Sequence, residues 1–140
     1  MFGHTYIEVN NTVFSFGRYA GGSSPPLGIM DPVGPGVLQK GTHQLAVDKM
    51  KKSPTLIYQF PLADANKIFG YLNGIYNSGT ANTGKNGGMV TGMTYTLLGP
   101  NCTTLVIGAL QVGGVNIPNL VSPSQFREWE GNQNLFMPAH

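Results

Sequence analysis

The sequence predicts an α+β domain in which a mixed or antiparallel sheet of roughly four to six strands packs against a helix near the C-terminus. Three patterns lead to this prediction. Apolar residues alternate with polar ones on both sides of Asn10-Asn11, recur at helical spacing between residues 62 and 76, and surround the segment 103–112 almost completely. A chain of 140 residues has the size of one domain, so we expect residues 1–140 to form a single unit.

A β-hairpin is predicted at the start of the chain. Residues 5–9 and 12–16 have strand character, and Asn10-Asn11 tolerates the positive backbone angles of a two-residue turn. In that register one face of the hairpin is mixed and contains His4, Tyr6, Glu8, Val13 and Ser15. The other face is apolar, as expected for a core, and contains Ile7, Val9, Phe14 and Phe16.

The remaining elements are predicted from periodicity and turn residues. A helix is predicted to begin at Pro61 and run to about residue 76, and a second, buried helix covers residues 103–112. A third begins at Ser122, where a capping serine precedes proline and glutamine. The other expected segments are a long loop at 17–36, strands at 37–40 and 55–60, a short strand or helical turn at 43–49, a polar loop at 78–88 and an extended segment at 93–98.

The weakly charged composition excludes several classes of function. Charged residues make up 10% of the chain, against about 25% in an average domain. The net charge is +2, and Lys49, Lys51 and Lys52 form the densest basic spot. Aromatic residues do not interleave with basic ones, so nucleic-acid binding has little support. No run of about 18 apolar residues predicts a membrane-spanning helix. The single cysteine excludes an internal disulfide and a thiolate zinc site, and we expect neither a metal nor a cofactor.

Cys102 is the candidate nucleophile. It lies at the predicted first turn of the buried helix, where unpaired amide groups and the helix dipole favour the thiolate. The preceding Gly99-Pro100-Asn101 makes a tight approach to the helix that would expose the sulfur to a groove. The alternative interpretation is a buried cysteine that acts as a small apolar residue. Position alone does not decide between the two.

His4 is the candidate base for this thiol, because a cysteine nucleophile needs a base within hydrogen-bond reach and a third polar group that orients the base. The other histidines are weaker candidates, since His43 falls in a predicted loop and His140 ends the chain. Ser15 is the first choice for the orienting group, and Glu8 is the second. The backbone amide at the start of the helix would contribute to an oxyanion hole.

Two segments resemble circularly permuted papain-fold proteins, a class that includes the lecithin–retinol acyltransferase-like group and NlpC-type cell-wall peptidases. GHTYIEV at 3–9, followed by VFSFG at 13–17, resembles the opening of these proteins, and YTLLGPNCTT at 95–104 looks like their nucleophile segment. The resemblance implies a permuted papain-like fold with Cys102 as nucleophile, His4 as base and Ser15 as the orienting residue. Acyltransferase relatives commonly carry a second histidine at the third position, where this chain has serine.

The resemblance also implies a function. It points to a cysteine peptidase or amidase that hydrolyses peptidoglycan stem peptides, with Gly3, Tyr6 and Asn101 as substrate-binding residues. The abrupt start and the Gly-rich loops are similar to C-terminal toxin domains of bacterial Rhs-type and type VI secretion effectors. That likeness implies a domain excised from a longer protein, an antibacterial effector that is secreted or delivered to the periplasm of a target cell, and a cognate immunity protein as partner.

Two other functions remain open at this point. The same residues would serve a lipid-directed thiol acyltransferase or phospholipase, for which Phe2, Leu27, Ile29 and Met30 would supply an apolar patch. A non-enzymatic binding module with a buried, structural cysteine is the alternative of another class.

Overall fold

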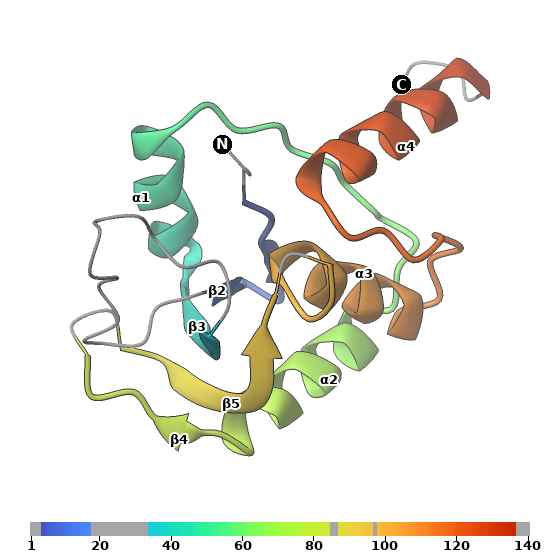
Figure 1. The fold of residues 1–140 in the computed structure, drawn as a ribbon. Coiled ribbons are helices and arrows are strands. Elements are labelled where there is room, and N and C mark those ends of the chain that lie inside the picture. The colour runs from blue at the N-terminus through green and yellow to red at the C-terminus, as the bar shows by residue number, and fades with distance from the viewer. Residues whose placement is uncertain (1–3, 18–33, 85–86, 97, 137–140) are drawn as a thin grey trace.

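Five strands of the chain form one antiparallel sheet in the order β1-β2-β3-β5-β4, which confirms the predicted α+β class (Figure 1). The structure is a computed structural model that describes residues 4–17, 34–84, 87–96 and 98–136. The strands are β1 (Ile7–Val9), β2 (Thr12–Gly17), β3 (Gly34–Thr42), β4 (Thr80–Ala81) and β5 (Met89–Tyr95). The helices are α1 (His43–Lys52), α2 (Ala65–Asn77), α3 (Cys102–Val112) and α4 (Pro123–Phe136).

The predicted hairpin is confirmed. Asn10 and Asn11 adopt positive φ angles of 50° and 57°, and Val9 pairs with Thr12 as the two-residue turn requires. The first strand begins at Ile7 rather than at residue 5. Residues 4–6 lie outside the ladder, and the side chain of Thr5 reaches α3 instead.

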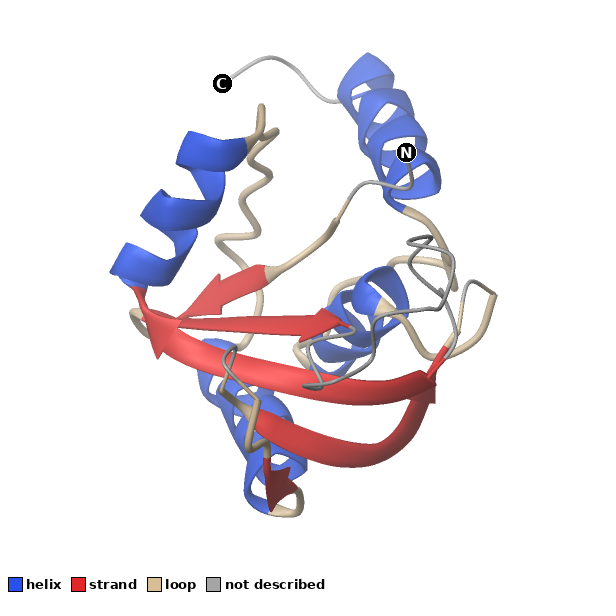
Figure 2. Ribbon diagram, turned by 60° about the vertical axis from the view of Figure 1, so that its left-hand side comes forward, coloured by secondary structure: helices blue, strands red, loops and turns tan. Residues whose placement is uncertain are grey.

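The apolar face of this hairpin forms the core, as predicted. Phe14 and Phe16 are each 1% exposed and pack against α2 and α3, which lie side by side on this face of the sheet (Figures 1 and 2). The buried positions of α3 recur on almost every side of the helix, which explains its apolar composition. The predicted packing of the cysteine-bearing helix on the sheet, with the preceding helix alongside, is therefore confirmed.

The opposite face of β2 is also covered. Val13 and Ser15 are fully buried there, although the hairpin pattern alone predicts a mixed face. Helix α1 crosses β2 and β3 on this side, and Lys49 reaches Gln39 of β3. A strand that is buried on both faces holds its side chains in fixed positions, which makes β2 the central element of the fold.

Several predicted boundaries differ from the structure. Residues 43–49 belong to α1, so His43 does not lie in a loop. Helix α2 begins at Ala65 rather than at Pro61, because the Asp64 carboxylate caps it by accepting a hydrogen bond from the Lys67 amide at 3.1 Å. The polar loop at 78–88 includes β4, and the extended segment at 93–98 begins earlier, as β5. Most of the loop predicted at 17–36 falls at 18–33, outside the described residues.

Residues 55–60 are the clearest departure from the prediction. The segment is extended but does not join the sheet (Figure 1). It connects α1 to α2 and packs through alternate aromatic side chains, Tyr58 and Phe60, against Phe126 of α4. Residues 55–60 therefore have the composition of a strand and an extended backbone, but they form no ladder with another strand. We call residues 55–60 the strap.

The close approach of β3 to β2 gives the first testable prediction. A Cβ atom at Gly36 would clash with the Phe16 ring and lie 2.8 Å from the Met93 carbonyl oxygen, whereas one at Gly70 of α2 would meet nothing within 4 Å. We expect Gly36→Ala to lower the free energy of unfolding by about 1–3 kcal/mol through overpacking. Gly70→Ala should raise it by about 0.5–1 kcal/mol, because alanine favours a helix. Denaturant unfolding measures both, and equal effects of the two substitutions would contradict this packing.

Candidate active site

A capping box fixes the start of α3. The Asn101 side-chain oxygen accepts hydrogen bonds from the Thr103 and Thr104 amides, each at 2.9 Å, and the Thr104 hydroxyl accepts from the Asn101 amide at 2.8 Å. The side-chain nitrogen of Asn101, Nδ2, also donates a hydrogen bond to the Val121 carbonyl oxygen at 2.9 Å. Both polar atoms of the Asn101 side chain are therefore used to stabilise the start of α3. The backbone N–H of Cys102 makes no hydrogen bond within the described residues.

A hydrogen bond joins the N-terminal segment to this helix start. The hydroxyl groups of Thr5 and Thr103 lie 2.9 Å apart, although the two residues are 98 positions apart in the chain. His4 directly precedes Thr5, and Cys102 directly precedes Thr103. The structure therefore brings the segments of the predicted base and the predicted nucleophile together.

The predicted partner of His4 is confirmed as a neighbour. His4 Nε2 and Ser15 Oγ are 2.7 Å apart. Successive side chains of an extended segment point to opposite sides, so His4 faces Ser15 while Thr5 faces α3. In the tautomer in which Nε2–H donates to the serine, the proton-accepting ring nitrogen is Nδ1.

The surroundings of His4 favour the neutral imidazole. Desolvation, and to a smaller extent the positive charge of Lys49, lower the pKa of His4 from 6.5 to about 4. As a whole residue His4 is exposed, so solvent screens it on its open side and opposes this desolvation there. Lys49 stands near the same group, with its Nζ 5.9 Å from the centre of the Tyr6 ring, and the Tyr6 ring lies 6.0 Å from that of His4.

The other predicted site residues make no hydrogen bond to His4 or Cys102 among the described residues. Glu8, the second choice for the orienting group, bonds His43 Nδ1 at 2.7 Å instead of His4. The Tyr6 hydroxyl is buried and has no hydrogen-bond partner among the described residues. Gly3 lies outside the described residues.

Cys102 is buried, and its side chain is only 3% exposed. Its sulfur lies 3.9 Å from the Thr103 hydroxyl, and no hydrogen bond joins it to His4 in the part of the chain that the structure describes. The residue also stands apart from the apolar cluster that the described residues form between α3 and the sheet. The sequence predicts a groove beside the sulfur, but the two cavities between α2 and β5 and between β3 and α1 are not lined by Cys102.

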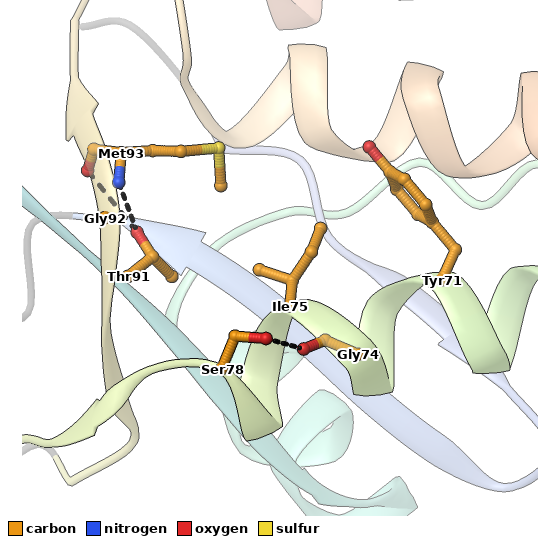
Figure 3. A pocket seen from close by; sticks show the side chains of 7 residues that line it. All are labelled: Tyr71, Gly74, Ile75, Ser78, Thr91, Gly92 and Met93. Carbon is orange, nitrogen blue, oxygen red and sulfur yellow. Dashed lines mark hydrogen bonds between the residues drawn. The ribbon is translucent and has the colours of Figure 1, made fainter.

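Two shallow cavities occur away from the cysteine. One of about 450 Å³ lies between α2 and β5, where the Ser78 and Thr91 hydroxyls bond neighbouring backbone groups (Figure 3). Another of about 320 Å³ lies between β3 and α1 and includes Lys40 and Asp48. Neither is lined by Cys102. The Ser78 and Thr91 hydroxyls of the larger cavity are satisfied within the protein.

Three residues of the site were missed by the sequence analysis. The alternation of a strand is a signal for Thr5, because its side chain must point away from that of His4. Asparagine followed three residues later by threonine is a capping signal for Thr104. Nothing in the sequence places Lys49 near His4, because that contact depends on how α1 folds back over the sheet.

The fold and the site together define an α+β protein with a cysteine at a capped helix start and a histidine–serine pair on the adjoining segment. Comparison with protein-family models, curated protein sequences and solved structures finds no match for this chain. Among the described residues, no helix is long and apolar enough to cross a membrane, and no cluster of three or more His, Cys, Asp or Glu side chains is placed to hold a metal ion.

The contact between the two segments predicts a measurable coupling. Thr5→Val or Thr103→Val leaves one hydroxyl without its partner, whereas the double substitution removes both. In a double-mutant cycle of unfolding free energies, we expect a coupling energy of about 0.5–1.5 kcal/mol. Additive effects would show that the two hydroxyl groups do not interact.

The lowered pKa of His4 predicts a pH dependence of stability. The unfolded chain takes up a proton near pH 6.5, whereas the folded chain does so only near pH 4. The contribution of His4 is therefore fully present above pH 6.5 and is lost as the pH falls from 6.5 towards 4. His4→Gln should reduce the loss of stability over this interval, as measured by denaturant unfolding at a series of pH values. An NMR titration midpoint for His4 at or above 6.5 would contradict the prediction.

Proposed function

We propose that the protein is a cysteine-nucleophile amide hydrolase of the permuted papain type. The observation that carries the proposal is the Thr5–Thr103 hydrogen bond, because it holds the residue after His4 against the residue after Cys102. Consecutive Cα atoms are about 3.8 Å apart, so each candidate residue lies one backbone step from this contact. The His4 side chain points to the Ser15 side, opposite to Thr5, so the imidazole has to turn towards the Cys102 sulfur when substrate binds. The His4–Ser15 bond adds a base with an orienting partner.

The reaction would follow the acyl-transfer scheme of cysteine hydrolases. The Cys102 sulfur attacks the substrate carbonyl carbon while His4 takes the thiol proton. His4 then returns this proton to the leaving amine as the C–N bond breaks and a thioester remains. Water, activated by the same imidazole, hydrolyses the thioester, which releases the acid and restores the thiol.

The helix start supplies a donor for the oxyanion. Asn101 occupies the Thr103 and Thr104 amides, so the Cys102 N–H remains for the negative oxygen of the tetrahedral intermediate. The dipole of α3 stabilises the same negative charge. The capping box therefore supports catalysis by fixing which amide is available.

The protonation state of His4 suits a general base. With its pKa lowered to about 4, the imidazole is neutral at pH 7 and accepts a proton. The burial of Cys102 requires that substrate displace the atoms covering the sulfur, and that His4 and the sulfur close on each other in the complex. Catalytic hydrogen bonds are often long in ligand-free enzymes and shorten only when substrate binds.

The substrate proposed is a peptidoglycan stem peptide, on the strength of the NlpC-like segments at 3–9 and 95–104. The setting proposed with it is an effector domain that acts in the periplasm of a target cell and has a cognate immunity protein. A lipid ester is the second substrate class for the same residues.

A second candidate function is a non-enzymatic binding module, and the 3% exposure of Cys102 favours it. In that case the thiol is a small buried side chain next to Thr103, and the His4–Ser15 bond satisfies a buried hydroxyl.

Activity on isolated substrates tests the proposal. The chain is incubated with purified peptidoglycan and, separately, with phospholipid vesicles, and the products are identified by mass spectrometry. We expect new amine and carboxyl ends in peptidoglycan, loss of this activity in Cys102→Ala, and a decrease of about 10²–10⁴-fold in His4→Ala, since that is the usual contribution of a general base. Ser15→Ala should decrease the rate less than His4→Ala, because serine only orients the imidazole.

Thiol alkylation separates the enzyme from the binding module. Because Cys102 is the single cysteine, iodoacetamide labelling of the intact chain reports on this thiol alone. An enzyme should be labelled in the native state, more slowly in His4→Ala than in the His43→Ala control. Labelling that occurs only at the rate of global unfolding, together with no product from either substrate, would eliminate the hydrolase and leave the binding module.

A further inference from the structure

The strap is a strand-forming segment without a strand partner. Its sequence, TLIYQF, consists mainly of β-branched, aromatic and aliphatic residues, carries no charge and contains neither glycine nor proline. Pro54 and Pro61 bound it on both sides. From Thr55 to Gln59, no backbone N–H or C=O makes a backbone hydrogen bond within the described residues. Backbone groups in this state form an open edge, which is a template for pairing with another strand.

One side of the strap is anchored. The Tyr58 ring stacks on Phe126 with centroids 5.3 Å apart, and the Phe60 ring meets Phe126 edge-on at 6.4 Å. Trp129 extends this contact along α4 at 6.3 Å from Phe126. The strap is therefore held extended before anything binds, and a strand that pairs with it would not have to order it first.

The other part of the strap exposes large aliphatic side chains. Leu56 is 62% exposed and Ile57 is 68% exposed. Two adjacent aliphatic residues on an unpaired extended edge are unusual for a surface connection, because natural proteins protect such edges with charges, prolines or bulges. Here the prolines lie only at the two ends and leave the centre open.

The charge beside the strap indicates the chemistry of the partner. Lys51 and Lys52 end α1 and are separated from the strap by Ser53 and Pro54; both lysines are exposed and make no ion pair in the part of the chain that the structure describes. The strap itself contains no acidic residue, and the first one after it, Asp64, is held at the start of α2, where its carboxylate accepts a hydrogen bond from the Lys67 amide. A second copy of the strap would therefore bring no carboxylate of its own to these lysines, whereas an acidic strand from another protein would.

We propose that residues 55–60 are a docking edge for a β-strand of a partner protein whose carboxylates lie beside Lys51 and Lys52. Main-chain hydrogen bonds to the strap provide the affinity, and Leu56 and Ile57 pack against the side chains of the added strand. The lysines fix the direction of the added strand, because they stand at one end of the strap only.

Synthetic peptides test this edge. The probes are two strand-forming peptides of alternating Thr and Val that end in Glu-Glu or in Lys-Lys, and binding to the intact chain is followed by fluorescence anisotropy. We expect the acidic peptide to bind more tightly. Lys51→Glu with Lys52→Glu should weaken the acidic peptide by about tenfold and strengthen the basic one, since two exposed ion pairs are lost and two repulsions are created. Equal binding of the two peptides would overturn the proposal.

Proline substitutions distinguish strand pairing from a merely sticky surface. Amides of successive residues in an extended chain point to opposite edges, so only one of Leu56→Pro and Ile57→Pro removes a donor from the edge that is used. We expect one variant to lose peptide binding and the other to keep it, while the matched controls Leu56→Thr and Ile57→Thr retain it. Equal effects of both prolines would overturn pairing.

The oligomeric state of the protein without peptide distinguishes a partner protein from a second copy of this chain. We expect a monomer by light scattering at the concentrations used for peptide binding. A dimer that the same proline variant dissociates would assign the strap to a second copy and overturn the acidic partner.

Discussion

The arrangement of the candidate site depends on one hydrogen bond, between the hydroxyl groups of Thr5 and Thr103. It closes a loop of 98 positions in a chain of 140 residues, so the entropy lost in bringing these segments together must be offset by the packing of the core around them. The β2 strand and α3 supply that packing through Phe14, Phe16 and the apolar sides of the helix. The hydroxyl pair then sets which residues of the two segments face each other, which nonspecific apolar contact does not do.

The burial of β2 on both faces explains why the site and the fold are coupled. Ser15 is completely buried, and a buried hydroxyl is costly unless it is hydrogen-bonded. His4 is one such partner at 2.7 Å, so the contact that orients the imidazole also satisfies the strand. A stabilising role and a catalytic role of this pair are compatible, which is why rates, labelling and stability have to be measured separately to apportion them.

Local patterns in the sequence predicted the hairpin and the buried helix, but not β4, the absence of 55–60 from the sheet, or most contacts between distant elements. The Asn10-Asn11 turn, the register beyond it and the all-round apolar α3 follow from residues that are neighbours in the chain. The His4–Ser15 pair was predictable for the same reason, since the hairpin register extended to residue 4 places His4 on the same face as Ser15 and diagonally adjacent to it. The contact of Lys49 with the Tyr6 ring depends on the path of a helix between distant strands, and the exposure of Cys102 depends on what covers it. Neither has a local signal.

The strap shows that strand propensity alone does not determine whether a segment joins a sheet. Residues 55–60 have the composition of a strand and the extended backbone of one, yet the sheet edge that would pair them lies elsewhere, because α1 and α2 fix the two ends of the segment. The last turn of α1 also divides its charges: Lys49 turns inward to Gln39 and the Tyr6 ring, whereas Lys51 and Lys52 face solvent beside the strap. A helix turns by about 100° per residue, so Lys51 points to nearly the opposite side from Lys49, and Lys52 is exposed at the last position of α1. One helical turn thereby contributes charge both to the surroundings of His4 and to the open edge.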